Sequence, residues 1–573
     1  MGSARNKGGN EKMDSIYAEK PWLKIYPEGT PHNLQITSDT SLGDFKKTAA
    51  HKPKATAVGY FDHAITYGEI DELSDSLAAA FVDLGLKKGD RIVIDLQNVP
   101  QFLVATYAAW KVGAIVVPLN PMYKERELTY FFQDSGAKLL FTLDEIANAL
   151  DLSFLKETLI EKVITTSSLD LLPSGMEIPQ LLRGTRKIRV PDTLDMLELI
   201  ESYRGNTLDV PDLSPQDVAY LTYTSGTTGP PKGAMNTHGN IAFNARVYKE
   251  MQYIKDNDVV LGVAPLFHAT GQVAHLAIAA LAGIPVILYY RFDAGETLRL
   301  IEQWRVTVTV ASITVYIALI NHEDIRKRDL SSFKKAYSGG APVSEATVRQ
   351  FEELTGLYLY NVYGLTETNS PSHIVPWGKR APVDPESGAL SVGVPVQNCV
   401  VKIMDLDEGT QELLPNQIGE IVDSGPMVIP GYWQKPEETR HAIRNGWLYT
   451  GDVGKMDKDG WFYVVDRKKD MIVASGYKVW PRDVEDVIYQ IPEVKETAVV
   501  GEPDPYRGET VKAYVALKEG MESSITPEDI VSFCRKNMAA YKYPRQVEIV
   551  PEIPKTPTGK FLRRSFREQL KTD

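Results

Sequence analysis

Short apolar runs alternate with helical patterns along most of the chain. Runs rich in Val, Ile, Leu and Tyr predict buried strands at residues 90–96, 114–119, 138–143, 219–224, 285–290 and 306–312. Apolar residues spaced three and four apart predict helices at residues 69–86 and 345–356. Strands that alternate with helices in this way indicate an α/β fold built from layers.

The pattern changes after about residue 450, where short strands surround Gly and Asp. Residues 454–466, GKMDKDGWFYVVD, predict a β-hairpin. The charged cluster DRKKD at residues 466–470 then leads into a smaller α/β unit, and we expect a hinge there. We therefore divide the chain into a leader and N-terminal arm (residues 1–29), a large domain (30–466) and a small C-terminal domain (467–573).

The composition is that of a globular protein. Of the 573 residues, 43% are hydrophobic and 24% are charged, and the formal net charge at pH 7 is −12. Nucleic-acid binding depends on clustered Lys and Arg, so this charge argues against a nucleic-acid partner. The two cysteines, Cys399 and Cys534, form no zinc or disulfide pattern, and we expect a protein of the reducing cytoplasm.

The longest apolar run, residues 272–290, is long enough to raise the question of a membrane span. Gly283 and Pro285 divide it into a helix-sized and a strand-sized piece. We therefore expect a buried helix followed by a buried strand and no transmembrane segment, which leaves room for transient contact with a membrane.

The segment YTSGTTGPPKG, residues 223–233, concentrates hydroxyl side chains and glycines around one lysine. Successive backbone N–H groups in such a turn form an anion-binding nest, and Lys232 adds positive charge. A Walker A loop needs Gly before its lysine and Ser or Thr after it, whereas Pro231 and Gly233 flank Lys232. The segment therefore predicts a phosphate-binding loop of another kind.

This loop resembles the phosphate loop of the adenylate-forming superfamily, which includes acyl-CoA synthetases, carrier-protein adenylation domains and firefly luciferase. Further motifs that resemble this family follow in order: APLFHATG (264–271), YSGGAPV (337–343), NVYGLTET (361–368), LYTGD (448–452), DRKKDMIVASGYKVWPRDVE (466–485) and PKTPTGK (554–560). The resemblance covers roughly residues 30–565. It implies a large N-terminal domain of layered α/β sheets with a distorted β-barrel-like part, followed by a small, mobile α+β C-terminal domain.

The resemblance also implies how ATP and AMP are bound. The phosphate loop would contact the phosphates, and Gly339 to Ala341 would form one wall of the adenine site. Tyr363 would stack on adenine, while Asp452 and Arg467 would bind the ribose. The residues implied in ATP and AMP binding are Thr224, Ser225, Gly226, Thr227, Thr228, Lys232, Gly339, Gly340, Ala341, Asn361, Tyr363, Gly364, Thr366, Asp452 and Arg467.

Four residues, Lys560, Glu367, Thr366 and His268, are expected to carry the chemistry. Glu367 offers hard oxygen ligands for Mg²⁺, with Thr224 as a second metal-site residue; alternatively, Thr366 is the N-cap of a helix with an acidic first turn. By resemblance, His268 lies beside the carboxylate of the substrate, and the alternative is a core histidine. By resemblance, Lys560 bridges that carboxylate and the α-phosphate.

The implied reaction has two steps. ATP converts a carboxylate into acyl-AMP and pyrophosphate, and the thiol of coenzyme A then takes the acyl group and expels AMP. The residues implied in coenzyme A binding are Ser475, Gly476, Tyr477 and Lys478. Because this stretch and Lys560 both lie beyond the hinge, we expect the small domain to rotate about Lys469 between the steps.

The expected substrate is an apolar monocarboxylic acid, because the chain most resembles medium-chain and long-chain fatty acyl-CoA synthetases. One departure is ASIT at residues 311–314, where fatty-acid members typically have Gly-Val-Pro-Thr. An aryl or hydroxycinnamate-type acid is the alternative substrate. A catalytically inactive nucleotide-binding sensor or scaffold is the alternative from another class of protein. We expect a monomer or a homodimer.

Overall fold

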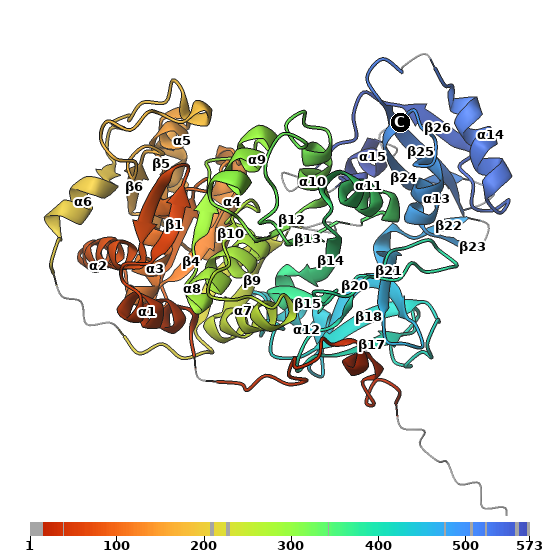
Figure 1. The fold of residues 1–573 in the computed structure, drawn as a ribbon, viewed down its shortest axis with the longest axis horizontal. Helices are drawn as coiled ribbons and strands as arrows, with labels where there is room; N and C mark the ends of the chain where they lie inside the picture. The colour runs from red at the N-terminus through yellow and green to blue at the C-terminus, as the bar shows by residue number, and fades with distance from the viewer. Residues whose placement is uncertain are drawn as a thin grey trace, which may run out of the picture.

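The computed structural model describes residues 15–37, 39–206, 211–224, 230–341, 343–474, 477–504, 508–521, 524–555 and 561–569. These residues form four β-sheets flanked by helices (Figure 1). The predicted α/β fold, with a large N-terminal part and a small C-terminal unit, is confirmed.

The largest sheet has nine strands and is parallel in its centre. In spatial order its strands are β16 (Val394–Pro395), β15 (Ser370–Ile374), β14 (Leu359–Leu365), β13 (Lys335–Gly339), β12 (Val308–Ala311), β10 (Val260–Leu261), β11 (Val286–Leu288), β1 (Thr56–Tyr60) and β2 (His63–Thr66).

A second sheet has seven strands, all parallel except the last pair. Its strands are β7 (Leu194–Asp195), β6 (Lys162–Thr166), β5 (Leu139–Leu143), β3 (Arg91–Asp95), β4 (Ile115–Pro118), β8 (Val218–Thr224) and β9 (Lys232–Thr237). Strands β4, β5 and β12 are buried at every residue, which explains why their sequences are continuous apolar runs.

Two smaller sheets follow in the chain. The third contains β17 (Val400–Met404), β18 (Gly419–Ser424), β19 (Ile443–Arg444), β20 (Trp447–Met456) and β21 (Phe462–Arg467). It is antiparallel. The fourth, in the C-terminal unit, contains β22 (Ile472–Ala474), β23 (Tyr477–Val479), β24 (Val494–Asp504), β25 (Gly508–Leu517) and β26 (Gln546–Ile549).

Helices cover these sheets. The α-helices are α1 (Ser41–His51), α2 (Tyr67–Asp83), α3 (Pro100–Val112), α4 (Glu125–Ser135), α5 (Asp144–Ala149), α6 (Met196–Ser202), α7 (His238–Met251), α8 (Ile278–Ala282), α9 (Ala294–Gln303), α10 (Ile313–Ile320), α11 (Glu345–Thr355), α12 (Pro436–Ala442), α13 (Pro481–Ile488), α14 (Pro527–Asn537) and α15 (Arg563–Gln569). The 3₁₀ turns are η1 (Pro21–Ile25), η2 (Leu152–Glu157), η3 (Gln180–Leu182), η5 (Thr366–Thr368) and η6 (Lys468–Asp470), and η4 (Gly271–Ala277) is a π-helix. Capping boxes at Thr66, Thr237 and Thr526 fix the starts of α2, α7 and α14.

Two local predictions are confirmed, one with a difference. The hairpin expected at residues 454–466 is formed by β20 and β21. The apolar run at 272–290 contains a helix and then strand β11, but the helix begins as the π-helix η4 before continuing as α8. Within the described ranges, no helix has both the length and the apolar character needed to cross a membrane.

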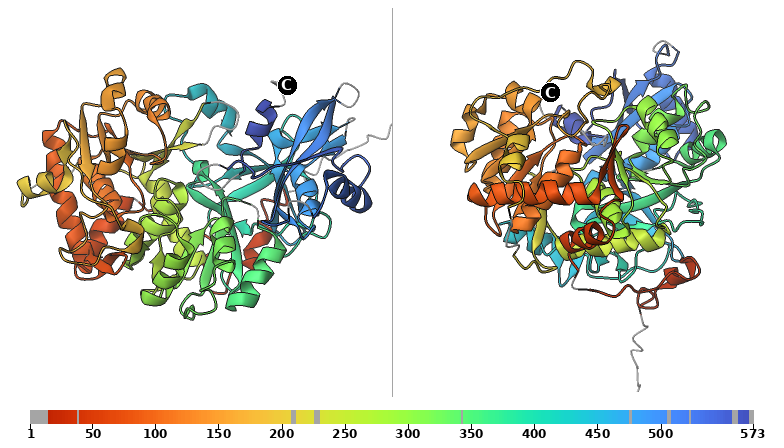
Figure 2. Two further views of the ribbon diagram at one scale, coloured as in Figure 1. Left: turned by 90° about the horizontal axis from the view of Figure 1, so that it is seen from above. Right: turned by 60° about the vertical axis from the view of Figure 1, so that its left-hand side comes forward.

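The hydrophobic core is divided near the predicted hinge. One large cluster of buried residues extends to Phe462, and a separate cluster begins at Ile472 in the C-terminal unit. Figure 2 shows this unit, in blue, at the opposite end of the molecule from the strands drawn in orange. The separate cores support a domain boundary within residues 466–470, which stays a proposal.

The described part of the N-terminal arm is packed into the fold. Trp22 in η1 is fully buried, and its ring meets that of Phe462 edge-on at 6.0 Å. Gly460, with φ 94°, lets the backbone of the β20–β21 turn approach Trp22, because a Cβ there would lie 2.6 Å from the Trp22 nitrogen. The hydroxyl of Tyr17 donates a 2.6 Å hydrogen bond to the carbonyl of Leu413. The arm therefore braces the third sheet.

We predict that Trp22→Ala destabilises the protein by about 3–5 kcal/mol, because it leaves a cavity under β21. Lys24→Ala is the matched control, since Lys24 is exposed and forms a surface pair with Asp459, and it should change stability by less than about 0.5 kcal/mol. Denaturant unfolding of both variants checks this. Equal effects of the two substitutions would show that the arm is not part of the core.

Candidate active site

Strands β8 and β9 hold the two ends of the predicted phosphate loop together. Thr224 ends β8 and Lys232 begins β9, and the two residues are partners in the antiparallel pair. The hydroxyl of Tyr130 donates a 2.6 Å hydrogen bond to the carbonyl of Pro231, which fixes the lysine end. The loop therefore joins two strands and not a strand and a helix. Ser225, Gly226, Thr227 and Thr228 lie outside the described residues.

Tyr432 connects the base of this loop to Glu367. Nζ of Lys232 lies 4.5 Å from the ring centroid of Tyr432, and the Tyr432 hydroxyl donates a 2.8 Å hydrogen bond to Oε1 of Glu367. Burial, together with the neighbouring Glu367 carboxylate, raises the pKa of Tyr432. The hydroxyl therefore stays protonated and orients one oxygen of Glu367.

Sequence reasoning missed Tyr432. Residues 431–433 run beside β9: the Trp433 N–H donates to the Gly233 carbonyl at 2.8 Å, and the Met235 N–H donates to the Gly431 carbonyl at 3.0 Å. The available signal was the pair of aromatic residues after Gly431, which a polar surface turn does not need. Only the tertiary pairing with β9 shows why they are there.

Glu367 lies in a tight turn and not at the start of an α-helix. Turn η5 joins β14 to β15, and Leu365 occupies its N-cap position. The alternative that Thr366 caps a helix is therefore wrong, since a strand begins at Ser370. Nδ2 of Asn236 donates a 2.9 Å hydrogen bond to the Thr366 carbonyl and holds the turn against β9.

Packing explains three glycines, Gly339, Gly340 and Gly364, among the residues predicted to bind ATP and AMP. A Cβ at Gly364 would lie 1.6 Å from the Ser370 carbonyl oxygen, and a Cβ at Gly339 would lie 2.8 Å from Cγ1 of Val362. Gly340 has φ 79°, which favours glycine. These glycines lie at or near the carboxyl ends of β13 and β14, the edge at which α/β sheets bind ligands.

The same edge carries other predicted residues. Asn361 in β14 is buried and its Nδ2 donates a 3.2 Å hydrogen bond to the Ser391 carbonyl, and Ala341 follows β13. Strand β12 ends at Ala311, and Oγ of Ser312 lies 2.7 Å from Oγ1 of Thr314 at the start of α10. The ASIT segment is thus beside the adenine wall along the edge of the sheet.

The buried Asp452 is held by Tyr363 and Arg467, which are partly buried. The Tyr363 hydroxyl donates a 2.7 Å hydrogen bond to Oδ2 of Asp452, and Nε of Arg467 lies 2.8 Å from Oδ1. The Asp452 side chain is 4% exposed, and its charge raises the pKa of Arg467. Each carboxylate oxygen keeps a lone pair for a ribose hydroxyl.

Lys469, the predicted hinge residue, lies in η6. Among the described residues its buried Nζ has no hydrogen-bond partner, and burial together with Arg467 lowers its pKa to about 8. An ammonium group held in this way is unfavourable. This cost is consistent with a hinge at Lys469, which stays a prediction.

Other predicted residues have little or no described environment. Tyr477 and Lys478 belong to β23, which pairs with β22. Ser475, Gly476 and Lys560 lie outside the described residues. The roles of all five stay predictions.

Two residues, Ala269 and Thr270, separate His268 from the start of the π-helix η4. It is half-buried, its N–H donates to the Pro265 carbonyl at 3.1 Å, and its carbonyl accepts from the Gln272 N–H at 3.0 Å. A π-helix is an unusual element that is frequent at functional sites. A position half open to solvent disfavours the alternative of a core histidine, and the catalytic role stays a prediction.

Glu367 fits the predicted Mg²⁺. Among the described residues, no group of three or more His, Cys, Asp or Glu side chains could hold a metal ion. Mg²⁺ at nucleotide sites is commonly bound by one or two carboxylates together with substrate phosphates. Glu367, beside the base of the phosphate loop, would hold the ion in this way, whereas the part of Thr224 stays a prediction.

A second carboxyl group, Asp423, lies near Asp452 and was not predicted. Asp423 in β18 is fully buried. Burial raises its pKa to about 7 against the lowering effect of the Ser372 hydroxyl, and the Asp452 charge raises it further. At acidic pH Asp423 is therefore neutral and adds no second negative charge beside Asp452.

Comparison with known proteins identifies the family. The family model described as AMP-binding enzyme matches residues 45–433, and the model of its C-terminal domain matches residues 483–560. The long-chain-fatty-acid–CoA ligase of Bacillus subtilis (strain 168) is 38% identical over 569 residues, which cover 97% of this chain and 99% of the relative. Feruloyl-CoA synthase of an Amycolatopsis species is 35% identical, covering 91% and 98%.

A solved structure agrees over nearly the full length. ATP-bound MatB from Rhodopseudomonas palustris is 26% identical, has a TM-score of 0.81, and covers 93% of this chain and 99% of its own. The apo structure of MatB, with the same coverage, has a TM-score of 0.72.

The chain belongs to the AMP-binding enzyme family. The predicted resemblance is thereby confirmed, as is the predicted class, an AMP-forming acid–thiol ligase.

We predict that Asp423→Asn stabilises the protein in a pH-dependent way. Asp423 keeps its proton up to about pH 7 when folded but releases it near its ordinary pKa of 3.8 when unfolded. The folded state therefore binds more protons between these values, so the wild type loses stability as pH rises through this window and asparagine does not. The two melting temperatures should be similar near about pH 4, and that of the variant should be higher near about pH 7.5.

Asp256→Asn, on an exposed turn, is the matched control and should leave the pH dependence of the melting temperature unchanged. A difference between wild type and Asp423→Asn that is the same at both pH values would contradict the account of a buried, protonated carboxyl group.

Proposed function

We propose that the protein is an ATP-dependent fatty acyl-CoA ligase. It activates a fatty acid as acyl-AMP with release of pyrophosphate, and then transfers the acyl group to coenzyme A. The observation that carries the proposal is the convergence of two clusters. Lys232, Tyr432 and Glu367 stand on the phosphate side, and Asp452 with Arg467 stands on the ribose side.

On the phosphate side, the residues counter the repulsion between two anions. The triphosphate and the attacking carboxylate must meet, and Lys232 brings one positive charge to the base of the loop. Mg²⁺, when bound, neutralises developing charge on the phosphate oxygens. Tyr432 donates to Oε1 of Glu367, and the other oxygen of this carboxylate would hold that ion.

On the ribose side, the residues fix the direction of the nucleotide. The hydroxyl of Tyr363 and the guanidinium of Arg467 hold the Asp452 carboxylate from two strands. The charge of Glu367 in η5 also raises the pKa of Arg467, so the ribose side lies within electrostatic range of η5. Orientation of this kind replaces a bimolecular encounter by a positioned attack.

Long-chain relatives along the whole chain support a fatty acid as the substrate. Because feruloyl-CoA synthase is also a relative, an aryl acid is the alternative substrate. The polar pair Ser312–Thr314 is the observation that favours it. An apolar acid fits better with residues 315–320 of α10, VYIALI, which are mostly apolar.

The small unit is proposed to serve both steps. Its core is separate, and Lys469 carries an unfavourable buried charge at the junction, which together support rotation about η6. The better superposition on ATP-bound than on apo MatB supports an adenylation-type arrangement. A cytoplasmic location, transient membrane contact and a monomeric or homodimeric state stay predictions.

We predict that pyrophosphate release in the presence of ATP and Mg²⁺ rises along the series from butanoate to dodecanoate. Each added methylene buried in the acyl pocket contributes up to about 0.8 kcal/mol, or about fourfold in kcat/KM, until the pocket is full. Ferulate and benzoate are the comparison acids and should be poorer. A higher kcat/KM for ferulate than for every fatty acid would overturn the substrate, and no release with any acid would overturn the activity.

A further inference from the structure

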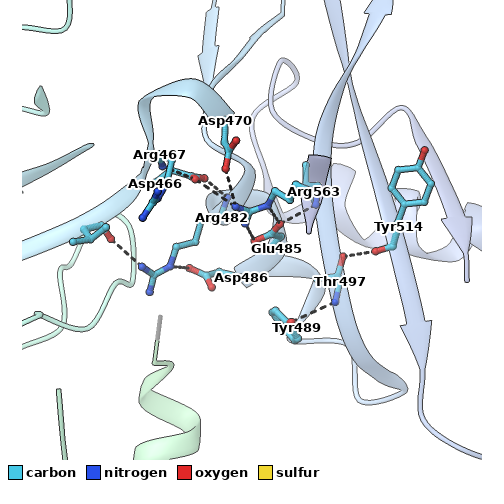
Figure 3. Close-up of polar contacts among 12 residues, drawn as sticks. Asp466, Arg467, Asp470, Arg482, Glu485, Asp486, Tyr489, Thr497, Tyr514 and Arg563 are labelled. Atoms are coloured by element: carbon cyan, nitrogen blue, oxygen red, sulfur yellow. Dashed lines mark hydrogen bonds and ion pairs between the residues drawn. The ribbon is translucent and has the colours of Figure 1, made fainter. Parts of the chain in front are cut away.

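One arginine near the C-terminus touches both sides of the junction between the two units. Arg563 begins α15, and its Nε and Nη2 lie 3.1 and 2.6 Å from the two oxygens of Glu485. Its Nη1 lies 3.4 Å from Oδ2 of Asp470 and 3.7 Å from Oδ1 of Asp466. Figure 3 shows the guanidinium of Arg563 among these carboxylates.

The three carboxylates belong to different parts of the molecule. Glu485 lies in α13 of the C-terminal unit, where the Val499 N–H donates a 2.8 Å hydrogen bond to it. Asp470 lies in the junction turn η6. Asp466 lies in β21 of the third sheet, next to the ribose-side residue Arg467. Arg563 therefore joins the C-terminal unit to the strand that builds the ribose side of the site.

A second arginine of the C-terminal unit, Arg482, also contacts strand β21. The backbone N–H of Arg482 donates a 2.9 Å hydrogen bond to Oδ2 of Asp466, and its Nη1 donates a 2.9 Å bond to the carbonyl of Val464. Asp466 is thus held by α13 and by α15 together. Its side chain is 3% exposed, so removal of Arg563 would leave a buried carboxylate with reduced compensation.

Arg563 lies three residues after Lys560 in the chain. Lys555 and Phe561 form an antiparallel bridge, and the Leu562 N–H donates a 2.8 Å hydrogen bond to the Pro554 carbonyl. These contacts close the base of the segment that carries Lys560, and Arg563 follows that base directly. Arg563, two residues after Phe561, is therefore anchored at the junction.

We propose that Arg563 is a positioning residue that fixes the base of the Lys560 segment relative to the ribose side of the site through Asp466. It touches no reacting atom and acts through Lys560. The inference rests on the proposed function, because Lys560 matters only if acyl-AMP is formed. It implies that the ion pair between Arg563 and Asp466 supports the first half-reaction and not the second.

The experiment measures the two half-reactions separately in the full-length protein. Acid-dependent pyrophosphate release reports the first, and formation of dodecanoyl-CoA from presynthesised dodecanoyl-AMP reports the second. For Arg563→Gln, kcat of the first should fall at least about tenfold, with the KM for ATP and the second half-reaction within about threefold of wild type. Arg563→Lys should recover part of the loss, because it keeps one charge without the fork geometry.

Two further variants make the result specific. Arg567→Gln removes the same charge one turn further along α15, where Arg567 pairs with Asp470 at 2.7 Å, and it should keep both half-reactions. Asp466→Asn removes the partner across the junction while Arg563 keeps Glu485 and Asp470. It should repeat the selective loss, and it decides the matter if Arg563→Gln does not fold.

The outcomes that overturn the inference are distinct from failure of the function. Equal pyrophosphate release by Arg563→Gln and Arg567→Gln would refute the positioning role, and so would equal loss in both half-reactions. Unchanged pyrophosphate release by Asp466→Asn would also refute it. Absence of pyrophosphate release by the wild type would instead refute the proposed function.

Discussion

The buried carboxylate of Asp452 is the contact on which the arrangement of the site depends. It accepts from Tyr363 of the nine-stranded sheet and pairs with Arg467 of β21, so it joins two sheets at one point. An isolated carboxylate at this depth would be costly, and two donors compensate it. Because Arg467 directly precedes η6, the same contact also sets where the C-terminal unit begins.

Charged residues form the two regions of the structure around this contact, the phosphate side and the junction. The phosphate side is built around Tyr432, which lies between Lys232 and Glu367 and keeps the cation and the carboxylate apart from direct pairing. The junction side is built around Arg563 and its carboxylates. The nucleotide and the metal would thus be held between Lys232 and Glu367 on the phosphate side and Asp452 on the ribose side.

Much of this could be predicted from the sequence, and the misses have physical causes. Strands such as β5 and β12 are buried on both faces, so their apolar runs stand out, and the sequence motifs contain Lys232, Glu367, Asp452 and Arg467. Tyr432 was missed because its local signal, the aromatic pair after Gly431, gains its meaning only from the pairing with β9. Asp423 was missed because it matters only through its burial beside Asp452, which no local pattern shows. The helix-cap alternative for Thr366 failed because the chain turns directly into β15.

The most direct test of the account is exchange of labelled pyrophosphate into ATP by wild type and by Glu367→Gln. Exchange requires reversible acyl-AMP formation, and the variant removes a charge at nearly constant shape, so it should fall by about two orders of magnitude while the melting temperature is kept. Glu438→Gln, an exposed residue of α12, should exchange like the wild type. Acid-dependent exchange by Glu367→Gln at the wild-type rate would contradict the claim that this carboxylate serves adenylation.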